Sequence, residues 1–186
     1  MEDAAQIRER LGEQVSRAEA ILFSGSGFSL GAADTSGRPI PTAGELRAEI
    51  WELLWPDEPV PDESTLSDTY AAGLLQARNR LAALMTSRLT VDPESVSPSV
   101  EVWLSIPWRR AYTLNIDDLE AAAQRRYSLP RKISPHSALG GDLPLGAPAE
   151  LQYVHLNGTL ADIPDVTFTE PQYGDRQGGS SPLYGQ

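Results

Sequence analysis

The feature that most constrains the fold of this chain is a short apolar run that ends in two glycines, Ile21-Leu22-Phe23-Ser24-Gly25-Ser26-Gly27-Phe28-Ser29. Such a run is typical of a buried parallel strand that leads through a tight loop into a helix. We expect Gly25 and Gly27 to adopt backbone conformations that other residues avoid, and to let a ligand approach the main chain closely. Main-chain amides at the start of the following helix favour a phosphate group. An ordinary strand–helix turn fits the pattern equally well, because the longer G-x-G-x-x-G fingerprint is absent and position 30 is leucine.

The composition excludes several kinds of site. A length of 186 residues suits one domain with a sizeable core, and no apolar run reaches the roughly 18 residues that a membrane-spanning helix needs. The formal charge of −11 argues against direct binding of nucleic acid, which requires a basic face. The chain has no cysteine and only two histidines, His136 and His155, so we expect no disulfide and no zinc site. The acidic N-terminus is not a secretory signal, and we expect a cytoplasmic protein without membrane contact.

Helical and strand patterns alternate along the chain. Apolar residues three and four apart predict a helix over residues 3–18. Thr42 and Glu45 have the spacing of a capping box, at the start of a helix that Pro56 ends. A long helix is predicted over residues 64–89, followed by a helical turn that holds Val100, Trp103 and Leu104. Strands are expected at 20–24, 111–114, 132–134, 151–156 and 166–169.

This alternation predicts an α/β, Rossmann-like parallel sheet with a helical insertion, at about residues 57–105, after the first strand. We assign residues 1–176 to this domain and residues 177–186 to a flexible Gly/Ser-rich tail. In a parallel sheet, ligands bind outside the carboxyl ends of the strands. Polar residues follow three of the predicted strands, at Ser24–Gly27, Leu114–Asp118 and His155–Gly158. We therefore expect these three segments to converge on one site.

Taken together, the three segments resemble the sirtuin-like family of NAD-consuming domains over roughly residues 20–173. Gly25-Ser26-Gly27-Phe28-Ser29 is similar to the family's G-A-G-x-S cofactor loop. Thr113-Leu114-Asn115-Ile116-Asp117 is similar to its T-x-N-x-D segment, and Val154-His155-Leu156-Asn157-Gly158 resembles the strand that carries its catalytic histidine. The resemblance implies two catalytic residues, Asn115 and His155, and an NAD-binding set made up of Gly25, Ser26, Gly27, Phe28, Ser29 and Asp117.

Two departures from the family narrow this interpretation. Deacylating sirtuins carry glutamine before the asparagine and a four-cysteine zinc module, whereas this chain has leucine at position 114 and no cysteine. The resemblance therefore points to the bacterial antiphage-defence NADases, in which such a domain is fused to a sensor or associates with partner subunits. The chain also ends soon after the third segment. We expect a domain truncated on its C-terminal side, and a homo-oligomer or a partner protein that completes it.

The predicted function is that of an NAD+ hydrolase, which cleaves the nicotinamide–ribose bond to give nicotinamide and ADP-ribose and depletes NAD when triggered. NAD is then the substrate, and the sequence leaves open whether the ADP-ribose is linear or cyclic. One alternative is a non-catalytic module that senses NAD or ADP-ribose, and another is an assembly module of a larger complex. The residues themselves also allow simpler roles, since Asn115 and Asp117 suit the start of a helix and His155 suits a structural hydrogen bond.

Overall fold

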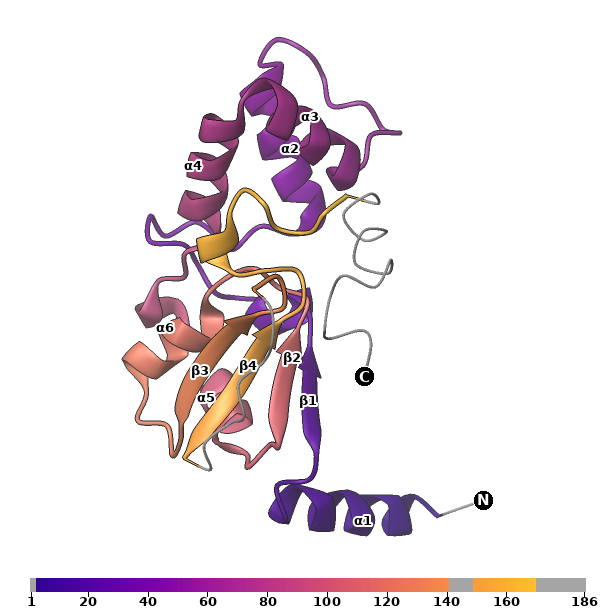
Figure 1. Cartoon of the computed structure of the whole chain (residues 1–186), viewed down its shortest axis with the longest axis vertical. Coiled ribbons are helices and arrows are strands. Elements are labelled where there is room, and N and C mark those ends of the chain that lie inside the picture. Colours follow the sequence, from indigo (N-terminus) through magenta and orange to yellow (C-terminus); the bar gives the residue numbers. More distant parts are fainter. Residues whose placement is uncertain (1–2, 141–148, 170–186) are drawn as a thin grey trace.

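A computed structural model describes residues 3–140 and 149–169, which form a mixed α/β fold with a four-stranded sheet and six α-helices (Figure 1). The strands follow the order β1-β2-β4-β3, and every neighbouring pair is parallel. The predicted Rossmann-like class is therefore confirmed. The strands are β1 (Ile21–Ser24), β2 (Arg110–Thr113), β3 (Lys132–Ser137) and β4 (Glu150–His155).

The register of the sheet brings three strand ends to one level. Ser24 at the end of β1 pairs with Thr113 of β2, and Thr113 pairs with His155 of β4. The residues that follow β1, β2 and β4 therefore leave the sheet side by side, as parallel pairing requires. This confirms that the three strand ends meet at one edge of the sheet.

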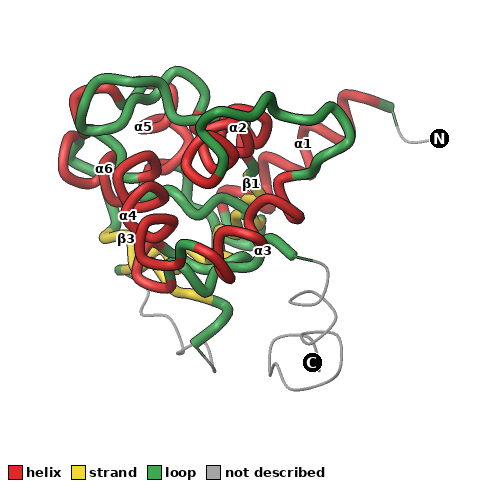
Figure 2. The backbone as a smooth tube through the Cα atoms, turned by 90° about the horizontal axis from the view of Figure 1, so that it is seen from above, coloured by secondary structure: helices red, strands yellow, loops and turns green. Residues whose placement is uncertain are grey.

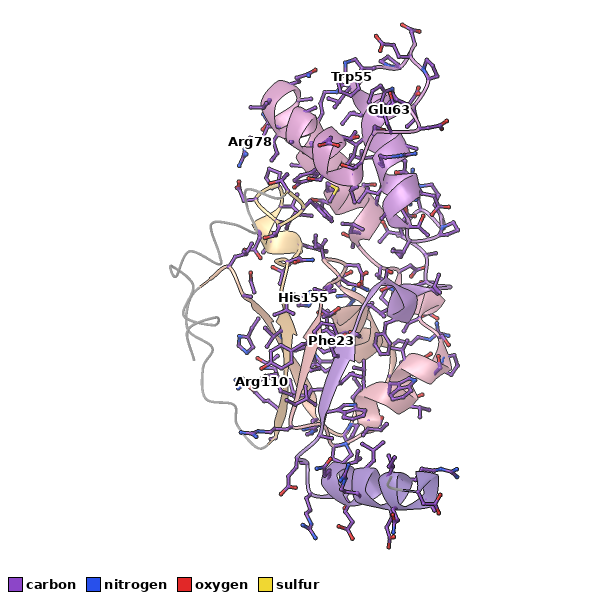
Figure 3. The ribbon with its side chains drawn as sticks, turned by 90° about the vertical axis from the view of Figure 1, so that its right-hand side faces the viewer. Phe23, Trp55, Glu63, Arg78, Arg110 and His155 are labelled. Atoms are coloured by element: carbon purple, nitrogen blue, oxygen red, sulfur yellow. The ribbon has the colours of Figure 1, made fainter. Side chains whose placement is uncertain are left out.

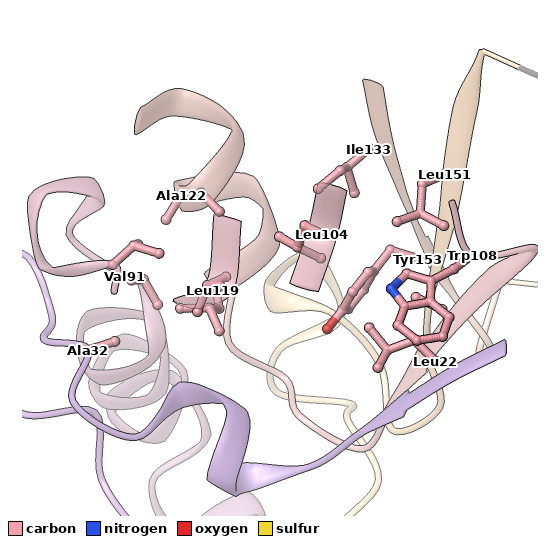
Figure 4. Close-up of a cluster of buried hydrophobic side chains, with 14 residues drawn as sticks. Leu22, Ala32, Val91, Leu104, Trp108, Leu119, Ala122, Ile133, Leu151 and Tyr153 are labelled. Atoms are coloured by element: carbon pink, nitrogen blue, oxygen red, sulfur yellow. The ribbon is translucent and has the colours of Figure 1, made fainter. Parts of the chain in front are cut away.

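The main hydrophobic core lies on one face of the sheet. Side chains alternate along β1, so that Leu22 and Ser24 are buried while Ile21 and Phe23 are exposed. The buried side chains pack against α5 (Pro98–Ser105) and α6 (Leu119–Arg126). Figure 4 shows this cluster, which includes Leu22, Leu104, Leu119, Ile133, Leu151 and Tyr153.

A second hydrophobic core belongs to a group of three helices above the carboxyl ends of the strands (Figures 1 and 2). Its members are α2 (Ala43–Leu54), α3 (Leu66–Gln76) and α4 (Arg78–Leu89). The predicted capping box is present, because the Thr42 hydroxyl accepts the Glu45 amide and the Glu45 carboxylate accepts the Thr42 amide. This helical group overlaps the insertion predicted at 57–105, whereas α5 packs with the sheet.

The predicted single helix over residues 64–89 is wrong, because the chain turns sharply at Ala77 (φ −148°, ψ 38°). The turn lets α3 and α4 pack on one another, with Tyr70 and Leu81 both fully buried in the second core. The helices approach closely at Gly73, where an added Cβ would lie 3.1 Å from the Leu81 side chain. The segment therefore forms two helices that pack on one another, in place of one continuous helix.

The strand predicted at 166–169 is also wrong. Val166 and Thr167 are buried, but they lie in an irregular segment outside the sheet. The Thr167 amide donates to the carbonyl of Asn157 (2.8 Å), and the Phe168 ring packs edge-on against Tyr70, with centroids 4.9 Å apart. This segment therefore contacts both the turn after β4 and the helical group.

The helix predicted at residues 3–18 is confirmed as α1 (Ala4–Ser16), which lies at the opposite end of the sheet from the helical group (Figure 1). Within residues 3–140 and 149–169, no helix has the length and apolar character needed to cross a bilayer. The predicted tail at 177–186 lies outside the described residues.

Candidate functional site

A cavity of about 440 Å³ lies between the carboxyl ends of β1 and β2 and the helical group. This volume falls within the usual range of small-molecule sites, about 300–1,000 Å³. Polar residues from the two strand ends form one side of it, and mainly apolar residues of the 30–43 segment and the helices form the other. The polar side comprises Ser26, Ser29, Asn115 and Asp117, next to Gly25 and Gly27; the apolar side includes Leu30, Ile40, Pro41, Leu46, Leu66, Leu89 and Phe168.

The two glycines leave open space beside the main chain. Gly25 is extended (φ −144°, ψ −165°), and neither Gly25 nor Gly27 has a positive φ, so the expectation of an unusual backbone conformation is wrong for both. A Cβ built on either residue would meet no atom within 4 Å. Because both residues line the cavity, the absence of side chains keeps this part of the wall free for close approach by a ligand.

Hydrogen bonds connect the segments that follow β1 and β2 along the polar side of the cavity, which we call the cavity floor. The Asn115 side-chain amide donates to the Ser29 hydroxyl (2.9 Å), and that hydroxyl donates to the Asp117 carboxylate (2.8 Å). Ser29 belongs to a short 3-10 helix (Ser26–Ser29) after β1, whereas Asn115 and Asp117 follow β2. The three polar side chains therefore form one connected set.

Asp117 is an ionisable group in the cavity wall with little access to solvent. It is 6% exposed, and burial raises the pKa of its carboxyl to about 6. The hydrogen bond from Ser29 opposes this effect, and the nearby charge of Glu120 adds to it. A carboxyl with such a pKa can exchange a proton near neutral pH, which is a common property of functional sites.

His155 lies behind the cavity wall, and no residue of the segment His155–Gly158 lines the cavity, so two of the three predicted segments meet there. The ring is 1% exposed at the end of β4, below the helical group (Figure 3). Its Nδ1 is 2.9 Å from the main-chain carbonyl oxygen of Asn115, and its Nε2 is 3.2 Å from Oε1 of Glu120. Glu120 lies in α6 and is 3% exposed. No sequence signal marks Glu120 as a site residue, because an acid in the first turn of a helix is commonplace.

The surroundings of His155 favour its protonated form. Burial alone lowers the pKa of the ring, but the hydrogen bond and the charge of Glu120 outweigh that effect, so the pKa is raised. Both partners accept hydrogen bonds, and an imidazolium donates to both. In this arrangement the ring has no free nitrogen to accept a proton from a ligand or from water.

Phe28 of the predicted set and Asn157 of the third segment lie elsewhere. Phe28 packs against the main hydrophobic core and lines, with Trp103, a second hollow that shares Gly25, Ser26 and Gly27 with the cavity. Asn157, which follows β4, donates through its side chain to the Leu114 carbonyl (2.9 Å). The structure thus brings Gly25, Ser26, Gly27, Ser29, Asn115 and Asp117 together around the cavity, and leaves Phe28 and His155 outside its wall.

Comparison with known proteins adds no relative: no family model matches the chain, and no curated protein matches it. The resemblance to sirtuin-like domains stays a prediction based on three short segments. Over residues 3–140 and 149–169, no group of three or more His, Asp or Glu side chains is arranged to hold a metal ion.

Proposed function

We propose that this chain is a binding module for a dinucleotide of the NAD type, held in the cavity at the carboxyl ends of β1 and β2. The observation that carries this proposal is the cavity floor, where an open glycine turn lies beside the connected side chains of Ser29, Asn115 and Asp117. Ligands of doubly wound sheets bind at this edge. The apolar side of the cavity suits the flat ring of a nucleotide base.

Each part of a dinucleotide has a matching group in the wall. Within the described part of the chain, no acceptor meets the main-chain amides of Ser26 and Gly27, so both are free to donate to phosphate oxygens. The Asn115 amide offers a donor and an acceptor for ribose hydroxyls. The Asp117 carboxyl accepts a hydrogen bond from an amide N–H, as the family resemblance implies for the nicotinamide group.

The position of His155 favours binding over hydrolysis. Cleavage of the nicotinamide–ribose bond passes through an oxocarbenium-like state, and a water or hydroxyl must then lose a proton. A histidine with both ring nitrogens engaged does not accept that proton. NAD hydrolysis remains a second candidate function because of Asp117, whose carboxyl lines the cavity. Burial raises the pKa of this carboxyl to about 6, so at pH 7.5 the ionised form would stabilise positive charge.

Calorimetric titration with NAD and with ADP-ribose, combined with chromatographic detection of free nicotinamide, tests the proposal. We expect saturable binding of both ligands and no nicotinamide above the level of a protein-free sample. Release of nicotinamide that Asp117→Asn abolishes and His155→Gln retains would establish the hydrolase instead. Failure of both ligands to bind would contradict both candidate functions.

A further inference from the structure

We propose that His155 and Glu120 form a buried pair that positions Asn115, and that loss of the His155 proton weakens nucleotide binding in the cavity. The inference rests on the proposed function, since it concerns the same cavity. It assigns His155 a positioning role that acts through Asn115, without contact between the ring and the ligand.

The pair is connected to the cavity through a continuous series of hydrogen bonds. Glu120 accepts from Nε2 of His155 (3.2 Å), and Nδ1 of His155 donates to the carbonyl of Asn115 (2.9 Å). The Asn115 side chain then donates to Ser29 (2.9 Å), and Ser29 donates to Asp117 (2.8 Å). Asn115 is therefore held at its main chain by the pair and at its side chain by the cavity floor.

Only the protonated ring satisfies both of its partners. A neutral imidazole carries one N–H, and the other nitrogen has a lone pair that repels an acceptor. The remaining proton stays on Nε2 and is donated to the Glu120 carboxylate, because hydrogen bonds to ionised groups are the stronger ones. The Nδ1 lone pair then faces the Asn115 carbonyl, so Asn115 keeps its hydrogen bonds to Thr113 and Ser29 but loses the one that fixes its carbonyl.

The ionisable groups around the ring stabilise its positive charge. Glu120 and Asp117 face it from α6 and the turn before it, and Asp162 acts on it from the 3-10 helix Leu160–Asp162. Tyr153, on the same strand, has its ring centroid 5.5 Å away. Because the pKa of His155 is raised, the positioned state is complete below the ordinary value of about 6.5 and is lost as the pH rises through the higher folded-state value.

The variant Glu120→Gln separates positioning from mere stability. A glutamine amide can donate to Nε2, which leaves a neutral ring to donate from Nδ1 to Asn115. We expect Glu120→Gln to bind ADP-ribose within about 3-fold of the parent at pH 7, with a constant affinity up to pH 9. The parent should lose about 3–10-fold over the same range, which corresponds to one hydrogen bond. Glu52→Gln, on the exposed side of α2, is the matched control and should behave as the parent.

Nitrogen NMR of the His155 ring, without ligand, provides the second measurement. The parent should show both ring nitrogens protonated at pH 7, with the Asn115 main-chain signals following the His155 titration. In Glu120→Gln the ring should be neutral at pH 7 with the proton on Nδ1. Three results would each overturn the inference. The first is a loss of ADP-ribose affinity between pH 7 and 9 in Glu120→Gln that equals the loss in the parent. The others are a neutral His155 ring in the parent at pH 7, and Asn115 signals that do not follow the His155 titration. If the parent binds neither ligand, the proposed function fails, and the NMR titration alone decides whether the pair positions Asn115.

Discussion

The side-chain amide of Asn115 lies 2.9 Å from the hydroxyl of Ser29, although the two residues are 86 positions apart in the sequence. This contact joins the turn after β1 to the turn after β2, directly at the cavity. Neither turn alone distinguishes a ligand site from an ordinary start of a helix. Their hydrogen-bonded contact in a cavity wall places an amide and a carboxyl beside the same space, which supports the proposed ligand site.

Replacement of Asn115 by alanine should weaken ligand binding far more than it weakens the fold. The change removes the bond to Ser29, which costs about 1 kcal/mol of stability, while the main-chain carbonyl that accepts from His155 is retained. We expect the affinity for ADP-ribose to fall about tenfold or more, measured by calorimetry, because ribose hydroxyls lose a donor and an acceptor. Asn79→Ala on the exposed side of α4 is the control. Equal affinities of Asn115→Ala and the parent would remove Asn115 from the site.

Gly27→Val tests whether the open space beside the glycine turn is used. The folded structure should tolerate the change, because an added Cβ meets no atom within 4 Å and Gly27 does not have a positive φ. The valine side chain would fill part of the cavity wall, so we expect the NAD affinity to fall at least about tenfold. Gly12→Val, in the exposed helix α1, provides the same substitution away from the cavity. A folded Gly27→Val protein with unchanged affinity would show that the ligand does not approach this turn.

Much of the fold was predictable, because its signals are local. The apolar run before Gly25 predicts β1, and the Thr42–Glu45 spacing predicts the start of α2. The convergence of three strand ends follows from parallel pairing alone. The break at Ala77 was not predictable, because no glycine or proline marks it and its cause is the packing of Leu81 against Gly73.

The cavity residues after β1 and β2 were predictable, but the position of His155 was not. A strand in the middle of a parallel sheet is buried on both faces, so its sequence does not show toward which helix an end residue points. His155 shares the face of Tyr153, and there it meets Glu120 of α6. This pairing depends on the angle at which α6 crosses the sheet, which no local pattern encodes.

Arg88→Met should destabilise the fold strongly. Arg88 is 4% exposed in α4 and binds three groups: the fully buried carboxylate of Asp34, Glu49 of α2 (2.7 Å) and the carbonyl of Pro39 (3.0 Å). The change removes the buried guanidinium partner of Asp34, which keeps the half-exposed Arg38 as an ion-pair partner, and we expect the free energy of unfolding to fall by about 3 kcal/mol in urea denaturation. These contacts connect α4 with the segment over residues 30–43, part of which lines the cavity.

The exposed pair Arg78–Asp165 provides the control for this effect. Arg78 donates two hydrogen bonds to Asp165 (2.7 Å each), but both side chains are largely exposed. Arg78→Met should therefore lower the free energy of unfolding by no more than about 1 kcal/mol. Similar losses for Arg88→Met and Arg78→Met would mean that burial of the Arg88 cluster contributes nothing.

Asp117→Asn should stabilise the protein at neutral pH while it weakens ligand binding. Burial raises the pKa of this carboxyl to about 6, above the value of about 3.9 in an unfolded chain. The folded state therefore holds the extra proton between these values, and the contribution of Asp117 to stability decreases as the pH rises from about 4 to 6 and stays level above. At about 1.4 kcal/mol for each pKa unit, ionisation of the buried carboxyl lowers the free energy of unfolding at pH 7 by roughly 3 kcal/mol. Asparagine removes the charge and can still accept from Ser29, so in urea denaturation at pH 4, 5, 6 and 7 Asp117→Asn should gain stability relative to the parent as the pH rises. The exposed Asp57→Asn is the matched control and should keep the parent's slope. A parent whose stability rises from pH 4 to pH 7 by the same amount as that of Asp117→Asn would show that Asp117 titrates normally and is not a strained carboxyl in the cavity.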